Sequence, residues 1–200
     1  MPATIQTIQK PTRARGLDTS GNNNHAQIYS GRALEFDGVT DYLDTNMTSA
    51  DAYGNNTNFS VTAWYRCNGN ESNYHTIVGN GNGWSAGVWL VVKDNDIRLN
   101  VNMNSGDYAL HHSVFKTTDD SIKSNTWYRI VATYDSVSGG KIYLNGVEAL
   151  NSDGMGEPLG DAYHATNVSI GAVSVDIGAA EYPADASICD VQIWDKTWTA

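Results

Sequence analysis

The chain has 200 residues, enough for one domain whose buried core needs no disulfide or metal to hold it together. Its 12 basic and 22 acidic residues give a formal net charge of −10, the wrong sign for a protein that neutralises nucleic-acid phosphates. The sequence contains no run of about 18 apolar residues, so no membrane-spanning helix is predicted. It is rich in turn formers, with 20 Asn and 19 Gly, and also in aromatic and β-branched residues, a mixture that predicts an all-β domain.

The N-terminal segment differs in composition from the rest. Lys10, Arg13 and Arg15 are three of the 12 basic residues, and Pro11 interrupts any regular element there. We therefore predict an extended arm over residues 1–16 that docks on a partner through these three basic side chains, with a frayed terminus as the alternative. The first six residues contain no apolar segment of a secretory signal.

From residue 26 onward, short apolar runs alternate with turn clusters. The pattern predicts strands over 32–36, 59–66, 84–93, 96–103, 108–115, 127–135, 141–144, 147–150, 167–172 and 187–194. Asp94-Asn95 and Asn145-Gly146 are two-residue hairpin signals. Turn signals recur every 8–15 residues or so, giving about twelve strands, and no helical pattern intervenes. This spacing predicts an antiparallel two-sheet sandwich or jelly roll.

Five sequence blocks, in order, resemble laminin-G-like domains of the concanavalin A-like lectin/glucanase superfamily. They are Leu-Asp-Thr-Ser-Gly-Asn-Asn-Asn-His from residue 17, the block 33–43 around Phe36-Asp37-Gly38, the block 59–64 ending at Trp64, the pair 127–135 and 141–146, and the block 190–194. The resemblance implies two antiparallel sheets of six or seven strands in a jelly roll over residues 17–200. The fold hosts lectins, adhesion modules, glycosidases and structural virion proteins, so the resemblance alone does not settle the function.

Catalysis is not expected. Retaining glycosidases need two carboxylates about 5–5.5 Å apart, and the nearest match to the glucanase pattern is Glu35-Phe36-Asp37, where Thr40 stands in the place of the second Glu. The chain has only five Glu, none of them paired along a strand face. His111 and His112 are adjacent, so on a strand they point to opposite faces. We therefore predict a protein that is not an enzyme.

Calcium binding is an expectation drawn from the resemblance. Some members of the family bind calcium near the first block and near an acidic pair before the last strand, which implies Asp18, Asn23 and Asp190 as ligands here. Carboxylate and amide oxygens suit Ca²⁺, but Cys189 occupies one of the acidic positions, and a thiol is a poor calcium ligand. The alternative is that Asp18 and Asn23 make local Asx turns.

A glycan site is predicted beside the loop 79–83. Lectins stack aromatic rings on sugars and hydrogen-bond the hydroxyls with amide groups, which gives Tyr74, Asn80, Asn82 and Trp84 as ligand-binding candidates. In the alternative interpretation, Trp84 caps the edge of the sandwich and Trp89 belongs to the core.

Both cysteines are predicted to be free thiols facing inward, because Cys67 shares its strand face with Phe59 and Val61, and Cys189 with Val191 and Ile193.

The combination favours a non-catalytic bacteriophage virion surface protein, because an extracellular type of fold lacks a secretion signal and follows a basic arm. Such a capsid-decoration or tail component would be located on the particle, dock through its arm on other virion proteins and present the jelly roll to solvent. The alternative is a glycan-binding or adhesion module of a larger extracellular protein, with cell-surface glycans as partners. Neither hypothesis involves nucleic acid or a membrane, and homo-oligomerisation stays open.

Overall fold

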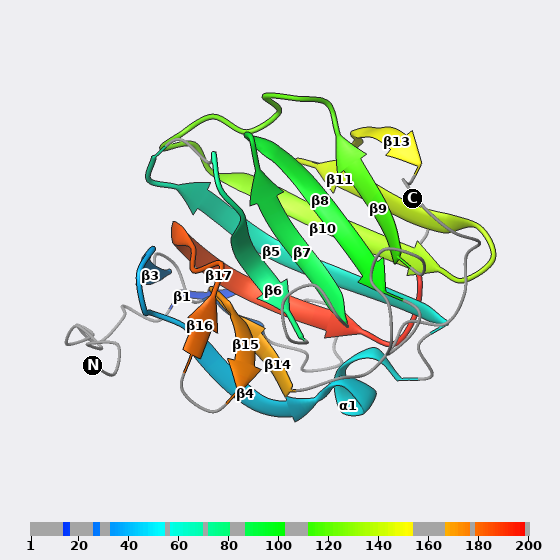
Figure 1. Cartoon of the computed structure of the whole chain (residues 1–200), viewed down its shortest axis with the longest axis horizontal. Helices are drawn as coiled ribbons and strands as arrows, with labels where there is room; N and C mark the ends of the chain where they lie inside the picture. Colours follow the sequence, from blue (N-terminus) through cyan, green and yellow to red (C-terminus); the bar gives the residue numbers. More distant parts are fainter. Residues whose placement is uncertain are drawn as a thin grey trace.

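The computed structural model describes residues 14–16, 26–28, 33–54, 57–69, 72–80, 87–102, 112–153, 167–176 and 179–198. Within these residues the chain forms a sandwich of two antiparallel sheets, which confirms the predicted jelly roll (Figure 1). The described helix is the single short segment α1 (Ser49–Tyr53), and no helix of the described part is long and apolar enough to cross a membrane.

The six-stranded sheet contains strands from four of the five sequence blocks, all but the first. In spatial order its strands are β12 (Val147–Glu148), β11 (Gly139–Leu144), β10 (Tyr128–Asp135), β5 (Asn58–Cys67), β17 (Asp185–Trp194) and β3 (Leu34–Asp37). The long central strand β5 pairs with β10 on one side and with β17 on the other.

The seven-stranded sheet packs against the six-stranded one. In spatial order its strands are β13 (Leu150–Asp153), β9 (His112–Thr117), β8 (Asp96–Asn102), β7 (Val88–Lys93), β6 (His75–Gly79), β14 (Asn167–Ile170) and β4 (Leu43–Thr48). In Figure 1 the strands β6 to β9 cross in front of β5, β10 and β17.

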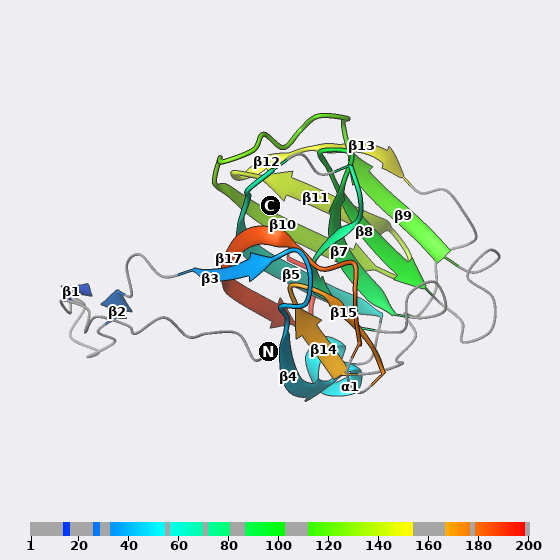
Figure 2. The ribbon, with the colours of Figure 1, turned by 60° about the vertical axis from the view of Figure 1, so that its left-hand side comes forward.

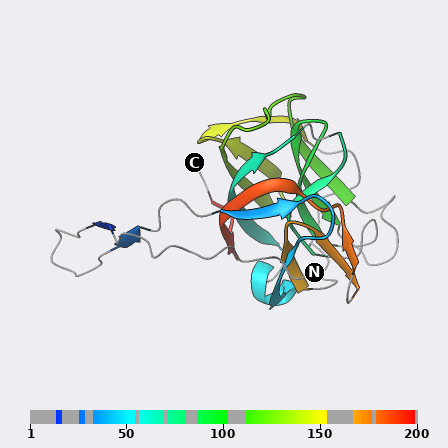
Figure 3. The ribbon, with the colours of Figure 1, turned by 90° about the vertical axis from the view of Figure 1, so that its left-hand side faces the viewer.

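Two further strand pairs lie outside these sheets. The strands β15 (Val173–Asp176) and β16 (Ala179–Glu181) pair with each other next to β14. The strands β1 (Ala14–Gly16) and β2 (Ala26–Ile28) form a ladder of their own, set apart from the sandwich in Figures 2 and 3. The predicted boundary between arm and domain after residue 16 stays a prediction.

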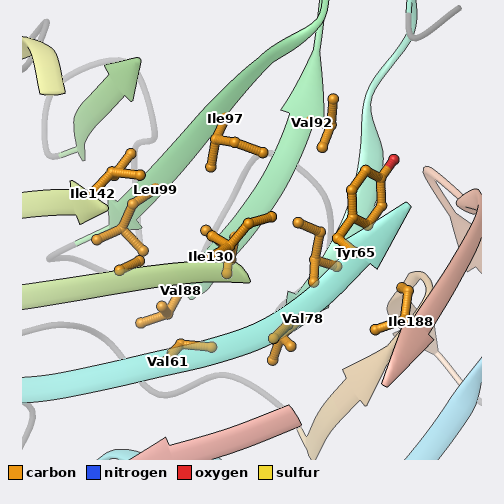
Figure 4. Close-up of a cluster of buried hydrophobic side chains, with 14 of the residues drawn as sticks. Val61, Tyr65, Val78, Val88, Val92, Ile97, Leu99, Ile130, Ile142 and Ile188 are labelled. Atoms are coloured by element: carbon orange, nitrogen blue, oxygen red, sulfur yellow. The ribbon is translucent and has the colours of Figure 1, made fainter. Parts of the chain in front are cut away.

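The core lies between the two sheets and follows the expected alternation. Phe59, Val61, Ala63 and Tyr65 of β5 are fully buried, as the period of two predicts. They meet a second fully buried set from β7 and β8, which includes Val92 and Leu99 (Figure 4). Each fully buried aliphatic or aromatic side chain contributes about 1.5–3 kcal/mol relative to an exposed one, so this layer provides most of the stability.

The two hairpin signals have the backbone geometry that they predict. Asp94 and Asn95 have φ angles of 53° and 59°, and Asn145 and Gly146 have 52° and 84°. Positive φ at both central residues is the type I′ turn, whose twist matches that of the flanking strands. The first turn joins β7 to β8, with Lys93 opposite Asp96, and so fixes the register on which the candidate site depends.

Several sequence-based boundaries are wrong. The predicted strand 147–150 is two strands, because after Ala149 the chain leaves the six-stranded sheet at β12 and enters the seven-stranded sheet at β13. The segments β1, β2, β4, β6, β15 and β16 were not predicted as strands, nor was α1 predicted. The helix begins at Ser49 and is N-capped by Thr48, whose hydroxyl accepts the Asp51 N–H.

Cys189 does not face the core as predicted. The register of β17 against β5 shifts between Cys189 and Gln192, and Asp190 has a φ of 50° inside this bulge. One extra residue reverses the alternation, so Val191 and Ile193 still pack on the core while Cys189 turns to the outer face, where it is half-buried opposite Trp64. Cys67 is buried as predicted, and both thiols are free.

Candidate functional site

The outer face of the seven-stranded sheet gathers charged and aromatic side chains at the turn between β7 and β8. Tyr74 directly precedes β6, and the pairing of His75 with Val92 places it beside Lys93. Lys93 lies opposite Asp96 across the hairpin, and one row further along Arg98 of β8 pairs with Lys116 of β9. We call Tyr74, Lys93, Asp94, Asp96, Arg98 and Lys116 the Tyr74 cluster.

Two cations lie close to the Tyr74 ring. The Lys93 Nζ is 4.6 Å from the ring centroid, and the Arg98 Cζ is 5.9 Å from it. A cation within about 6 Å of an aromatic face is attracted by the quadrupole of the ring. Both side chains keep part of their surface in solvent, so the ring and the cations form one accessible array.

The buried carboxylate of Asp96 holds Arg98 and Lys116 in place within this array. Its side chain is 0% exposed, Arg98 donates to both of its oxygens (Nε to Oδ1 at 2.9 Å, Nη2 to Oδ2 at 3.2 Å), and the Lys116 Nζ lies 3.8 Å from Oδ2. Burial alone would lower the pKa of Arg98, but the hydrogen bond and charge of Asp96 keep that pKa above its usual value. The guanidinium is therefore held as a fixed cation.

Asp94 completes the cluster at its exposed rim. Its carboxylate lies 3.4 Å from the Arg98 Nη2 and 3.9 Å from the Lys93 Nζ, and it is more than half exposed. The site thus offers hydrogen-bond donors and acceptors side by side around one aromatic ring.

A small group of aromatic and apolar side chains, which we call the apolar shelf, lies on one side of the cluster and consists of Tyr182, Trp89, Val91 and Val173. The Tyr182 ring is 5.5 Å from Tyr74 and 5.6 Å from Trp89, and Trp89 packs with the fully buried Val91 and Val173. The N–H of Thr76 donates to the Tyr182 carbonyl (3.0 Å), which fixes Tyr182 beside β6. Trp89 is thereby part of a small core on this outer face, in line with the alternative given for it from the sequence.

Two buried polar atoms near the shelf have no hydrogen-bond partner among the described residues. They are the Thr76 hydroxyl and the Asn100 side-chain nitrogen, and both residues are almost fully buried. Thr76 pairs with Val91 and Asn100 with Trp89, so both belong to the same outer face. Leaving such a group unsatisfied is costly, so a ligand or water that reaches it gains a hydrogen bond.

The predicted glycan residues separate in the structure. Tyr74 lies in the cluster, but Asn80 is fully buried: its Nδ2 donates to Ser49 Oγ (2.8 Å), its Oδ1 accepts the Val88 N–H (2.8 Å) and its carbonyl accepts the Trp89 indole N–H. Asn80 therefore links the end of β6 to α1 and to the start of β7 instead of offering its amide to a ligand, a correction to the prediction. Asn82 and Trp84 lie outside the described residues.

The predicted calcium ligands are not brought together in the described part of the chain. Asp18 and Asn23 lie outside it, and Asp190 already binds Arg129 (2.8 Å) and Gln192 (2.7 Å) through its two carboxylate oxygens. No group of three acidic, His or Cys side chains suited to a metal occurs among the residues described. Calcium binding stays a prediction.

The predicted docking residues are placed only in part. Arg15 lies in β1, opposite Gln27 of β2, while Lys10 and Arg13 lie outside the described residues. The docking role of the arm stays a prediction.

Glu35 and Asp37, the nearest match to a catalytic pair, both have structural partners. Both Glu35 oxygens accept the Ser187 hydroxyl (2.8 and 2.7 Å). One Asp37 oxygen accepts the backbone N–H groups of three residues of the following turn, Val39, Thr40 and Asp41.

The sequence contains a local signal for two residues of the cluster, Asp96 and Arg98. Asp96, Arg98 and Asn100 alternate along a predicted strand whose other positions are apolar, so one face of that strand had to be polar. The pairing with Lys93 and Lys116 depends on the order of strands in the sheet, which no local pattern contains.

The comparisons with known proteins agree with this fold. A laminin-G family model, described as concanavalin A-like lectin/glucanases superfamily, matches residues 37–200. The chain belongs to this laminin-G family. No curated protein sequence matches it significantly.

Solved structures similar to this laminin-G-like chain include modules of carbohydrate-active proteins. The CBM40 of the Ruminococcus gnavus IT-sialidase, solved bound to α2,3-sialyllactose, has a TM-score of 0.63 at 12% identity, over 84% of this chain and 94% of that one. A mutant of the NanB sialidase from Streptococcus pneumoniae has 0.62 at 15% identity, but this chain spans only 26% of its length. The LG4-5 domains of the mouse laminin α1 chain have 0.57 at 10% identity, over 88% of this chain and 47% of theirs.

Proposed function

We propose that this laminin-G-like chain is a non-catalytic glycan-binding module that binds an oligosaccharide at the Tyr74 cluster. The observation that carries the proposal is the combination on one outer face of a cation-flanked ring with two buried polar groups that lack partners among the described residues. The module type agrees with the CBM40 neighbours, which were solved with α2,3- and α2,6-sialyllactose bound.

The chemistry of the cluster suits a sugar. A pyranose presents an apolar C–H face and a rim of hydroxyls that both donate and accept hydrogen bonds. The Tyr74 ring offers an apolar surface, Lys93 and Arg98 donate, and the exposed Asp94 carboxylate accepts. Because three of the 12 basic residues of an acidic chain gather here, a glycan bearing a carboxylate also finds cations within reach.

A non-catalytic role agrees with the partners of the two candidate carboxylates. Glu35 is hydrogen-bonded to Ser187, and Asp37 to a backbone turn, so each acts in holding a strand end. The resemblance to the sialidase covers a quarter of that protein, so its activity does not transfer to this chain.

The test is a glycan array followed by calorimetric titration of the best-retained glycan, with α2,3-sialyllactose and lactose as defined probes. We expect measurable binding, and we expect Tyr74→Ala to weaken it at least tenfold. Tyr143→Ala is the matched control, because Tyr143 lies on β11 of the other sheet. Absence of retention on the whole array, or equal affinity of Tyr74→Ala and wild type, would contradict the proposal.

A virion location remains the finer proposal for this module. It depends on the basic arm, and we expect a chain lacking residues 1–16 to lose binding to phage particles while still melting cooperatively. Unchanged particle binding by the shortened chain would remove this role and leave glycan binding untouched.

A further inference from the structure

The outer face of the six-stranded sheet carries most of the tryptophans. Of the six in the chain, Trp64, Trp127, Trp194 and Trp198 lie on this side. Trp64, Trp127 and Trp194 are 38%, 38% and 37% exposed. Trp64 is unusual because it is exposed although it lies on β5, a central strand with a neighbouring strand on each side. We call the first three of these residues the tryptophan face.

The register aligns these rings along the sheet. Trp127 precedes β10 and falls opposite Arg66, the neighbour of Trp64 two residues further along the same face of β5. Trp194 of β17 pairs with Ser60, four residues from Trp64 in the other direction. Four residues of a strand span about 13 Å, so the rings form an elongated row and not a single pocket.

Two of the three indoles, Trp127 and Trp194, are held in place by ring and cation contacts. The Arg66 guanidinium lies 5.4 Å from the Trp127 ring, and the Lys196 Nζ lies 5.4 Å from the Trp194 ring. Trp198 packs on Trp194 with ring centroids 5.3 Å apart. Rings fixed in this way lose little conformational entropy when a ligand stacks on them.

The floor between Trp64 and Trp194 is polar and electrically balanced. Arg129 donates to Asp190 (2.8 Å) and to the Thr62 hydroxyl (3.0 Å), and Gln192 donates to the other Asp190 oxygen. At the Trp127 end, Arg66 donates to Ser187, which in turn donates to Glu35. Arg66 lies 3.8 Å from Glu35 and Arg129 lies 2.8 Å from Asp190, so both arginines of this floor are balanced by a carboxylate.

This arrangement favours a neutral sugar chain over a second copy of the protein. The rings are separated by hydrogen-bonding side chains instead of forming one continuous apolar patch, as a self-associating face would. Two copies that each carry a net charge of −10 also repel one another. A row of stacking rings over a polar floor matches a polymer with alternating apolar faces and hydroxyl edges.

We propose that the tryptophan face is a second carbohydrate-binding surface, one that takes an extended run of uncharged pyranose units, independent of the Tyr74 cluster. The two surfaces lie on opposite sides of the sandwich, since one belongs to each sheet's outer face (Figure 1). One molecule can therefore hold a polymer on one side and a terminal oligosaccharide on the other.

The experiment is native affinity electrophoresis of the full chain in gels containing hydroxyethylcellulose, laminarin or galactomannan. We expect at least one of these neutral polysaccharides to retard the wild type. Trp64→Ala and Trp194→Ala should each weaken the retardation at least tenfold, Trp64→Phe should keep most of it, and Tyr74→Ala should leave it unchanged. Thermal melting of each variant checks that it is folded.

Three results would overturn the proposal. They are no retardation by any of the three polymers, retardation that both tryptophan variants retain, and a wild-type dimer in light scattering that Trp64→Ala dissociates, which would make the face a self-interface. Trp64→Ala should still bind the array-selected glycan like wild type, so failure here and failure of the Tyr74 site are distinguishable.

Discussion

The two outer faces of the sandwich hold their charges in different ways. On the seven-stranded sheet, a carboxylate with no exposed surface, Asp96, anchors Arg98 beneath the Tyr74 ring. On the six-stranded sheet, the corresponding pair, Arg129 and Asp190, is partly open to solvent. Substitutions in the charged pair of the first face should therefore lower the free energy of unfolding strongly, whereas substitutions in the pair of the second face should lower it little. Variants of the seven-stranded face can therefore lose ligand binding because they lose stability, whereas variants of the six-stranded face should lose binding alone.

The largest expected effect is a difference in stability between two arginine variants, one on each face. Arg98→Met leaves the buried Asp96 with only Lys116 at 3.8 Å, so we expect the free energy of unfolding to fall by about 3 kcal/mol. The matched change on the other face, Arg129→Met, should cost less than about 1 kcal/mol, because its partner is half-exposed. Urea unfolding of both variants measures the difference. Equal losses would show that the two faces do not differ as described.

The next effect concerns Tyr74. Its half-buried ring contacts Tyr182 and two cations, so Tyr74→Ala should lower the free energy of unfolding by about 1.5 kcal/mol in addition to weakening glycan binding. Tyr74→Phe keeps the ring and should restore the stability. If calorimetry shows that the alanine variant unfolds like wild type, the ring is not packed as the structure places it.

Acid sensitivity should come from the six-stranded sheet. The Thr40 and neighbouring backbone N–H groups hold the pKa of Asp37 below its usual value, and those of Ser138 and Val137 do the same for the pKa of Asp135. A carboxylate whose pKa is lower in the folded state stabilises the fold at pH values above its unfolded-state pKa, which is near 3.8. This stabilisation is lost as the pH falls through the folded-state pKa. Asp37 is exposed and Asp135 is only half-buried, so each contribution is small.

Asp37→Ala tests this at two pH values. We expect it to cost about 1 kcal/mol at pH 7, from the lost turn hydrogen bonds, and less at pH 2.5, because the pH is then falling toward the lowered folded-state pKa of Asp37 and the ionised form that makes these bonds is being lost. Denaturation curves at both pH values give the comparison. A cost that is the same at pH 7 and pH 2.5 would mean that the charge of Asp37 has no part in holding the turn.

The smallest expected effect is at Trp64. Because its indole lies outside the core and is 38% exposed, Trp64→Ala should change the free energy of unfolding by about 0.5 kcal/mol. Thermal melting beside Tyr74→Ala makes the contrast direct. A loss above about 2 kcal/mol would mean that the ring is a structural element and not a binding surface.

Local sequence patterns were sufficient for the fold and for part of the site. The alternation of Phe59 to Tyr65 and the turns at Asp94-Asn95 and Asn145-Gly146 depend only on neighbouring residues, and the structure confirms them. The orientation of Cys189 was missed because a one-residue bulge reverses a face, and nothing in the apolar pattern marks it. Asn80 was misassigned for a similar reason, since its burial depends on Ser49, 31 positions away.

Of the residues in the Tyr74 cluster, the sequence predicted only Tyr74 as a ligand-binding residue. Its cations come from β7, β8 and β9, so their meeting depends on sheet order and on the register set by one hairpin. The tryptophan face likewise needs the pairing of β17 with β5, in which Trp194 lies opposite Ser60, 134 positions away.

The most direct test of the glycan proposal is a ¹⁵N–¹H correlation spectrum recorded while the array-selected glycan is titrated into the labelled chain. Saturable shifts are expected at the backbone amides of Lys93, Arg98 and Lys116, with those of Trp64 and Trp194 unchanged. A spectrum that stays constant to high glycan concentration, or shifts confined to the six-stranded sheet, would contradict binding at the Tyr74 cluster.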